Sequence, residues 1–427
     1  MTPLGLGELS ESSFAVCLLA ILLIPCASAG LALIYAGLGR FRNAAHSMTS
    51  ALCVFAIAAG VTFCVGSAWQ GYAGQAAYTL RAAGRDWNWI GAEQFFLRGV
   101  ETGGASSLAA LFGLLGAGLA ALIPLGSGSD RWRLGSSCAS TALLAAVTFP
   151  LFAHWAWGGG WLAHIGFLDS GGAGAIQAVG GLTALSIAWI LGPRRGKFSS
   201  EGMPAALPGH NAVLVLLGCF LAWVGWLGLN CAGSILFTGV ALTRTVLVAV
   251  NTTLAASSAA LAAATITRAR FGKTDASLCA NGWVGGLVAA SAGCAVMRPA
   301  AAIIVGLIAG VLVVYSVEWL ELRLGVDDPG GSASVHAVSG MWGLIAVGPL
   351  GALLPGGVPG QWLAQLVGVA TLLGFVLPAS YGLNWLLNRV SPQRVAIEGE
   401  RQGLDLYELG AGAYPDFQTH NDDFWQR

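Results

Sequence analysis

The sequence predicts an all-α polytopic membrane protein with eleven transmembrane helices, built as an inverted five-helix repeat plus one extra helix. Three observations support this prediction. Of the 427 residues, 56% are hydrophobic and only 9% are charged, whereas ordinary soluble domains have about 25% charged residues. Apolar runs of about 20 residues, the length that spans a bilayer, recur along the chain. Finally, one stretch of sequence occurs twice.

Glycine, proline and charged residues interrupt the apolar runs and set the bounds of the expected spans. The spans are expected at 13–37, 45–68, 94–125, 135–157, 169–191, 211–229, 234–266, 277–297, 299–323, 335–354 and 361–388. Lysine and arginine accumulate in cytoplasmic loops of membrane proteins. With the N-terminus outside, 15 of the 20 lysines and arginines fall on the cytoplasmic side. The predicted orientation is therefore N-out, C-in.

The duplicated stretch links residues 169–185 to residues 328–344, and seven of its 17 positions are identical. Each copy has one polar side chain inside an apolar run, Gln177 in the first and His336 in the second. The copies begin the fifth and the tenth span. Because an offset of five spans is odd, the two halves must cross the membrane in opposite directions, as in the inverted repeats of many transporters.

This offset gives the expected domain organisation. Repeat A covers about 13–191, repeat B about 211–354 and helix eleven about 361–388, so that 1–388 form one transmembrane domain and 389–427 a polar cytoplasmic tail. The formal net charge is zero, so no basic surface indicates a nucleic-acid partner. The nine cysteines lack metal-ligand spacing and are expected to be small core residues, with no cofactor or metal site.

Several specific strings occur along the chain in a fixed order. They are GLALIYAGL from Gly30, HWAWGGGWLA from His154, LGPRRGKF from Leu191, WVGWLGLN from Trp223, IVGLIAG from Ile304, LGVDD from Leu324, GLDL from Gly403 and AYPDF from Ala413. Together they resemble the ammonium transporter (Amt/Mep/Rh) family over essentially the whole chain. The resemblance implies an eleven-helix, N-out fold in the cell (inner or plasma) membrane. It also implies a homotrimer with one pore per subunit, between the two repeats.

The resemblance assigns substrate recruitment to the outer pore mouth. Trp157 matches the tryptophan that offers its π face to the cation, although a tryptophan of the membrane interface is an alternative. The family's serine after Asn230 corresponds either to Gly233 or, by a small shift, to Ser234. Asp169 matches an aspartate near the outer end of span five. It is expected to cap the helix by accepting hydrogen bonds from the amides of residues 171 and 172, or to attract the cation electrostatically.

The chain departs from the family at the gate that follows. Typical members stack two phenylalanines across the pore mouth, but the corresponding positions are Glu101 in span three and Leu229 in span six. Glu101 lies three residues after Arg98, so the two can pair along one helix face. Alternatively, the Glu101 carboxylate attracts cations at the vestibule or neutralises a larger amine.

The pore centre departs as well. The family usually has two histidines at the positions of Gln177 and His336, and these share and pass a proton. An imidazole can donate, accept and take up a second proton near neutral pH, whereas an amide cannot carry a proton. Gln177 is expected to bond His336 and line a polar channel without joining a proton relay. A structural core histidine is the alternative interpretation of His336.

The sequence thus predicts a channel or transporter that moves ammonium or ammonia through an altered gate and relay. A scaffold retuned to another small amine or solute, and a non-conducting ammonium sensor, remain open alternatives. An enzyme is not expected, because His336 and Ser339 share one helix without a third catalytic group or an oxyanion site. Besides the bilayer and the small cation, the resemblance implies a tail that crosses to a neighbouring subunit and a possible PII-type signal protein as partner.

Overall fold

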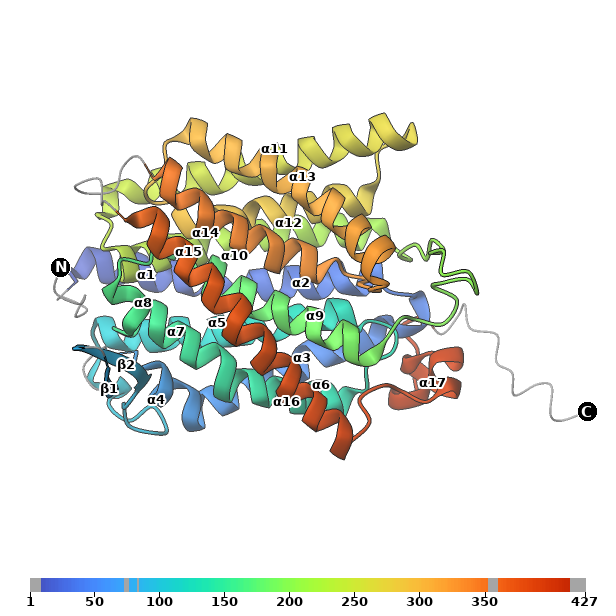
Figure 1. Cartoon of the computed structure of the whole chain (residues 1–427), viewed down its shortest axis with the longest axis horizontal. Helices are drawn as coiled ribbons and strands as arrows, with labels where there is room; N and C mark the ends of the chain where they lie inside the picture. The colour runs from blue at the N-terminus through green and yellow to red at the C-terminus, as the bar shows by residue number, and fades with distance from the viewer. Residues whose placement is uncertain (1–8, 73–76, 83, 352–359, 415–427) are drawn as a thin grey trace, which may run out of the picture.

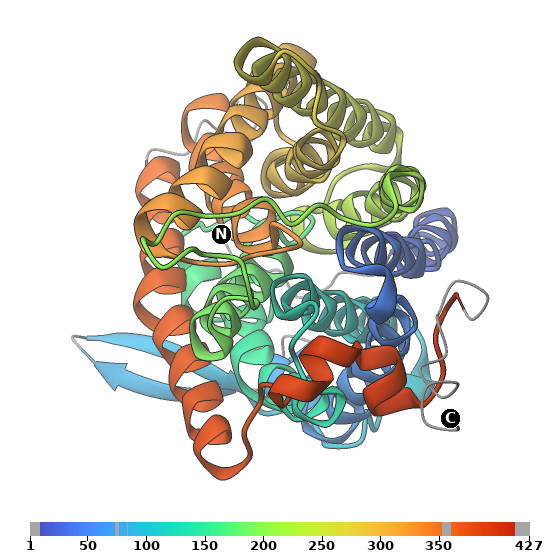
Figure 2. The ribbon, with the colours of Figure 1, turned by 90° about the vertical axis from the view of Figure 1, so that its right-hand side faces the viewer.

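The helices run side by side along one direction and form a single bundle (Figure 1). In the computed structural model the described residues are 9–72, 77–82, 84–351 and 360–414. One end of the bundle, here named the mouth end, carries a β-hairpin and α8 (Trp161–His164). The opposite end, the tail end, carries α17 (Ile397–Gln402) and faces the viewer in Figure 2.

Ten helical segments of the described chain are long and apolar enough to cross a membrane. They consist of α1 (Glu11–Ile21) with α2 (Ile24–Leu38); η1 (Phe41–Asn43) with α3 (Ala44–Val61), η2 (Thr62–Gly66) and α4 (Ser67–Gln70); α5 (Ala105–Gly128); α6 (Leu134–Leu143) with η4 (Leu144–Thr148), α7 (Phe149–Ala156) and α8; η5 (Ala173–Ala178) with α9 (Val179–Leu191); α10 (Ala212–Thr238); η6 (Leu242–Arg244) with α11 (Thr245–Phe271); α13 (Pro299–Leu324); η7 (Ala333–Val338) with α14 (Ser339–Leu350); and α15 (Gln361–Thr371) with η8 (Leu372–Val376) and α16 (Leu377–Val390). The predicted class, an all-helical membrane protein, is confirmed.

The eighth predicted span corresponds to α12 (Ala276–Gly293), which is not among these ten segments. It packs against α10, α11, α13 and α14 and is buried along most of its length. Because other helices surround it, α12 can carry Asn281 and Ser291 where a lipid-facing helix would need apolar side chains. The count of eleven spans and the N-out orientation stay predictions.

Two predicted boundaries are wrong. Span three was expected from residue 94, but α5 begins at Ala105. Gly99, Gly103 and Gly104 precede it with φ values of 94°, 76° and 93°, a left-handed backbone that ends any helix. The expected break between spans six and seven, after residue 229, lies inside α10, which continues to Thr238.

The two copies of the duplicated stretch have the same local structure. The helix of each copy begins with a six-residue π-helical segment, η5 or η7, which continues as an α-helix. In Figure 1, α9 runs from the mouth end toward the tail end and α14 runs the opposite way. The same correspondence appears in packing, because α9 lies against α5 and α14 against α12. These features agree with an inverted repeat; residues 352–354 of predicted repeat B lie outside the described residues.

Helices α2 and α10, which belong to the first span of each half, pack closely through glycine. A Cβ on Gly30 would lie 2.5 Å from the backbone nitrogen of Ala222, and one on Gly218 would lie 2.6 Å from the carbonyl oxygen of Gly30. Small residues allow this close approach of helix backbones in membranes. The contact between α2 and α10 brings Tyr35, near the end of α2, to the interface between the halves.

A two-stranded antiparallel hairpin, β1 (Ala77–Ala82) and β2 (Arg85–Gly91), projects from the mouth end (Figures 1 and 2). Its base is fixed to the bundle by tryptophans: the indole N–H of Trp155 donates to the carbonyl of Trp89 at 2.7 Å, and the rings of Trp87 and Trp161 lie 5.6 Å apart. The hairpin was not predicted, because its strands are short and lie between two apolar runs.

A buried ionic cluster joins the two halves at the tail end. Arg194, which follows α9, bonds both carboxylate oxygens of Asp327 at 2.9 and 3.0 Å and the carboxylate of Asp130 at 3.1 Å. Burial alone would raise the pKa of Asp327, but the hydrogen bonds and charge of Arg194, together with the charge of Arg131, outweigh burial and lower this pKa. The ionised cluster therefore fixes the segment that leads into the second copy.

The tail folds back over the bundle end of its own subunit (Figure 2). Asp405 accepts from the backbone amides of Ala45 and His46 at the start of α3, at 3.2 and 2.7 Å. Glu408 accepts from the amide of Leu134 at the start of α6 at 2.9 Å and pairs with the His46 ring at 2.8 Å. Tail carboxylates thus cap two bundle helices. Residues 415–427 of the predicted tail lie outside the described residues.

Candidate functional site

The polar centres of the two copies meet in the middle of the bundle. The Gln177 amide oxygen lies 2.8 Å from the Nδ1 atom of His336, and both side chains are buried. The predicted contact between Gln177 and His336 is present in the structure. Opposed helix segments from the two halves each contribute one partner, and the contact lies where those halves pack together.

The hydrogen-bond partners determine which ring nitrogen carries hydrogen. An amide oxygen can only accept, so the Nδ1 atom of His336 must donate to Gln177. The Nε2 atom is then left with a lone pair, and the Tyr35 hydroxyl lies 3.2 Å from it and can donate to it. The result is a chain from Tyr35 through His336 to Gln177. It ends at an amide, which cannot pass a proton onward.

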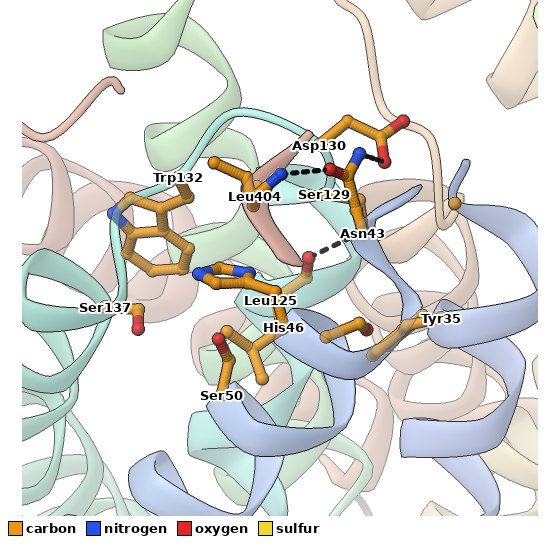
Figure 3. A pocket seen from close by; sticks show the side chains of 13 residues that line it. Tyr35, Asn43, His46, Ser50, Leu125, Ser129, Asp130, Trp132, Ser137 and Leu404 are labelled. Carbon is orange, nitrogen blue, oxygen red and sulfur yellow. Dashed lines mark hydrogen bonds between the residues drawn. The ribbon is translucent and has the colours of Figure 1, made fainter. Parts of the chain in front are cut away.

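Tyr35 was not among the predicted site residues, although it lies in the string from Gly30 that carried the family resemblance. Its hydroxyl meets His336, and its ring lines a small cavity on the tail side (Figure 3). The cavity has a volume of about 20 Å³, enough for about one water molecule. Asn43, His46 and Leu404 also line it, the last from the tail.

At the mouth end, three aromatic rings form a compact cluster. The Trp157 and Phe237 rings are stacked, with centroids 4.5 Å apart and planes only 6° apart. Phe112 meets both rings edge-on, at 5.6 Å from Trp157 and 5.2 Å from Phe237. Trp157 is held in place because its indole N–H donates to the carbonyl of Asp169 at 2.7 Å. Because Phe237 is stacked on it, one face of the predicted recruitment tryptophan is covered.

Phe112 and Phe237 were also missed by sequence reasoning. Glu101 and Leu229 stand at the expected gate positions, which left the mouth without phenylalanines. The structure instead brings in two others, Phe112 from α5 and Phe237 from α10. Phe237 lies two helical turns beyond Leu229, and only the continuation of α10 past residue 229 carries it to Trp157. No local sequence signal marks this contact.

Glu101 does not lie on a membrane helix. It occupies a 3-10 turn, Val100–Thr102, ahead of α5, and its carboxylate accepts from the amide of Gly99 at 3.0 Å. The expected alignment of Glu101 with Arg98 along one helix face is therefore wrong, because the left-handed Gly99 separates them. The Glu101 side chain is exposed and lies outside the bundle core.

Leu229 and Ser234 are fully buried in α10. The Ser234 hydroxyl lies 3.7 Å from the Cys294 sulfur, and its side chain is thus engaged with α12's C-terminal end. Gly233 packs directly on the carbonyl of Ser170, so a serine side chain does not fit there. Of the two alternatives for the recruitment serine, only Ser234 supplies a hydroxyl in this part of the helix.

Asp169 caps η5, but through other amides than expected. One carboxylate oxygen accepts from the amides of Gly174 and Ala175, both at 2.9 Å, rather than from Gly171 and Gly172. The reason is that Gly172 has a left-handed backbone, so the helical segment begins only after it. Burial raises the pKa of Asp169 to about 6, although these hydrogen bonds oppose the rise. Its second oxygen has no partner in the described structure.

Comparisons with known proteins find similar sequences along most of the chain. Residues 15–414 match the model of the Ammonium Transporter Family. The chain is 36% identical to ammonium transporter Amt2 of Archaeoglobus fulgidus, covering 97% of this chain and 92% of that protein. It is 34% identical to ammonium transporter 1 member 1 of Arabidopsis thaliana, covering 76% of this chain and 72% of that protein.

Solved structures share the fold. The structure named Sensor Amt Protein aligns with a TM-score of 0.84 and 28% identity, covering 93% of this chain and 98% of that chain. Mep2 of Candida albicans aligns with a TM-score of 0.79 and 22% identity, covering 97% and 92%. The second likeness concerns the fold alone.

Proposed function

The chain belongs to the ammonium transporter family, and we propose that it moves ammonium or ammonia across the cell membrane through a pore in each subunit, between the two repeats. The observation that carries the proposal is the buried contact between Gln177 and His336. Each repeat contributes one polar group to it, and such groups inside a membrane bundle mark a substrate path. The aromatic cluster at Trp157 supplies a site for a small cation at the mouth end.

The pore centre carries the uncharged form of the substrate. His336 donates through Nδ1 and accepts through Nε2, so it can exchange hydrogen bonds with a neutral molecule that has a lone pair and N–H groups. Gln177 keeps the path polar but cannot take up the proton that ammonium would leave behind. The expected transport is therefore uptake of ammonia nitrogen without an accompanying current.

Proteoliposomes test this proposal directly. Ammonium uptake and membrane current are measured on the same preparation, with His336→Ala as the pore variant. The expected result is uptake without current in the wild type and loss of uptake in His336→Ala. Large currents that survive His336→Ala would contradict the argument on proton transfer. Binding of ammonium without any uptake would indicate the sensor alternative, and uptake of a larger amine alone would indicate a retuned pore.

The assembly and its partner are part of the same proposal. A homotrimer and a PII-type signal protein at the tail end are supported by the family, while in the described chain the tail contacts its own subunit. Native mass spectrometry of the purified protein tests the trimer. Co-purification with the PII-type protein of the same cell tests the partner, with a chain ending at residue 410 as control.

A further inference from the structure

One face of the Trp157 ring is already occupied by Phe237. An ammonium ion gains from an aromatic ring when it lies over the ring face, within about 6 Å of the centroid. The Phe237 ring lies over Trp157 at 4.5 Å and nearly parallel to it. Phe237 and a cation cannot share this face, so recruitment on this side of Trp157 requires the phenyl ring to leave.

Of the two phenylalanines in the cluster, only Phe237 is placed to move. Phe112 has no exposed surface and lies in the middle of α5. Phe237 is partly exposed and lies in the last turn of α10, which ends at Thr238 before the left-handed Gly239. The Thr238 hydroxyl donates to the Ser170 hydroxyl at 3.0 Å, which holds the helix end while the neighbouring phenyl ring can change rotamer.

We propose that Phe237 is a side-chain lid on the recruitment site: it stacks on Trp157 when the site is empty and turns aside when an ammonium-sized cation binds. This inference rests on the proposed function. Phe112 meets both rings edge-on and borders this site, so the room that opens is limited to the volume that one phenyl ring leaves. Phe237 thereby determines the size of amine that is admitted and favours ammonium over its methylated forms.

The test compares amines rather than overall rates. Uptake of ammonium, methylammonium and dimethylammonium is measured in proteoliposomes for the wild type, Phe237→Ala and Phe237→Leu. Phe220→Ala is the matched control, because Phe220 lies on the same helix and is 60% exposed. In Phe237→Ala we expect the ratio of dimethylammonium to ammonium uptake to rise about tenfold, the scale on which pockets distinguish single methyl groups. Phe237→Leu, which keeps most of the bulk, should stay near the wild-type ratio.

The outcomes separate the lid from the function. Wild-type uptake of ammonium with an unchanged ratio in Phe237→Ala would overturn the lid and leave the proposed function intact. Absence of ammonium uptake in the wild type would overturn the proposed function itself. A structure of the wild type with saturating methylammonium provides a test without variants. We expect the Phe237 ring turned away and the cation over Trp157, whereas a bound cation beside an intact stack contradicts the lid.

Discussion

The two copies of the duplicated stretch share a backbone and differ in their surroundings. In the second copy, Asp328 uses both carboxylate oxygens, accepting from the Ser127 hydroxyl at 2.7 Å and from the amides of Ser332 and Ala333. In the first copy, Asp169 uses only one oxygen for amides. The aspartate that begins the copy at the tail end thus uses both of its oxygens, whereas the aspartate that begins the copy at the mouth end keeps one oxygen as a spare acceptor.

This difference indicates that the two similar copies have different roles. The second copy is fixed by the ionic cluster at Asp327 and presents His336 in a defined hydrogen-bonding state. The first copy lies next to the aromatic cluster, because the Asp169 carbonyl holds Trp157. Its polar residue, Gln177, has an amide nitrogen without a partner in the described structure. In the proposed pathway, the second copy anchors the pore centre and the first copy faces the incoming substrate.

The largest expected effect comes from the anchor of the second copy. Asp327→Asn removes the charge that Arg194 and Arg131 face in the buried cluster, and an uncompensated buried charge costs about 3–5 kcal/mol of unfolding free energy. Thermal unfolding of the purified protein in detergent measures this loss. Glu318→Gln is the control, since it breaks an exposed pair with Arg270 and should leave the midpoint nearly unchanged. Equal shifts in both variants would remove the special role of the second copy.

The next effect makes the two copies alike. Gln177→His places an imidazole opposite His336, so that both partners can carry a proton. Ammonium uptake should then be accompanied by a current about 10²-fold above the wild-type background, the lower range for a positioned proton-transfer group. Solid-supported membrane recordings measure it. Gln177→Asn, which keeps an amide, should stay at background; a current in that control would mean that the amide is not the block.

A pH dependence distinguishes the first copy. The unfolded carboxyl of Asp169 has a pKa of about 3.9, and burial raises it to about 6 in the folded protein. The folded state therefore holds the proton more tightly, and this contribution to stability is present below about pH 4 and lost as the pH rises through about 6. Compared with Asp169→Asn, the wild-type unfolding midpoint should fall over this interval. Parallel pH curves for the two proteins would contradict the raised pKa.

The smallest effect concerns the link from His336 to α2. Tyr35→Phe removes the hydroxyl that meets Nε2 and keeps the ring, so we expect a loss of about 1 kcal/mol in unfolding free energy. Thermal unfolding detects this change. Tyr72→Phe is the matched control, because the Tyr72 hydroxyl donates to a backbone carbonyl outside the pore centre. If Tyr35→Phe were as stable as the wild type, the wild-type Tyr35 hydroxyl would lie next to His336 without a stabilising hydrogen bond to it.

The helical membrane class and the contact between Gln177 and His336 could be predicted, because apolar runs and an internal duplication can be recognised directly in the sequence. The start of α5 and the length of α10 could not. Glycine can end a helix or allow helices to pack closely. Gly99 has a left-handed backbone and lies before a helix, whereas Gly233 lies inside a helix and packs against Ser170. Only the neighbours decide which use applies.

The aromatic cluster shows the same limit. Phe112, Trp157 and Phe237 come from three separate helices, and their stacking depends on how far α10 extends and on how the helices cross. A sequence contains the three rings but not their relative rotation. Tyr35 lay within a recognised string, yet only the packing of α2 at the interface between the halves brings its hydroxyl to His336.

The capping of α3 and α6 by Asp405 and Glu408 has a consequence for how the protein is made. Chains are synthesised from the N-terminus at about 5–20 residues per second, so α3 and α6 enter the membrane long before their caps exist. The starts of both helices must depend on water or on lipid headgroups until the segment with Asp405 and Glu408 is translated. That segment follows the helix starts by 360 and 274 residues along the chain, so it completes helices that were inserted much earlier.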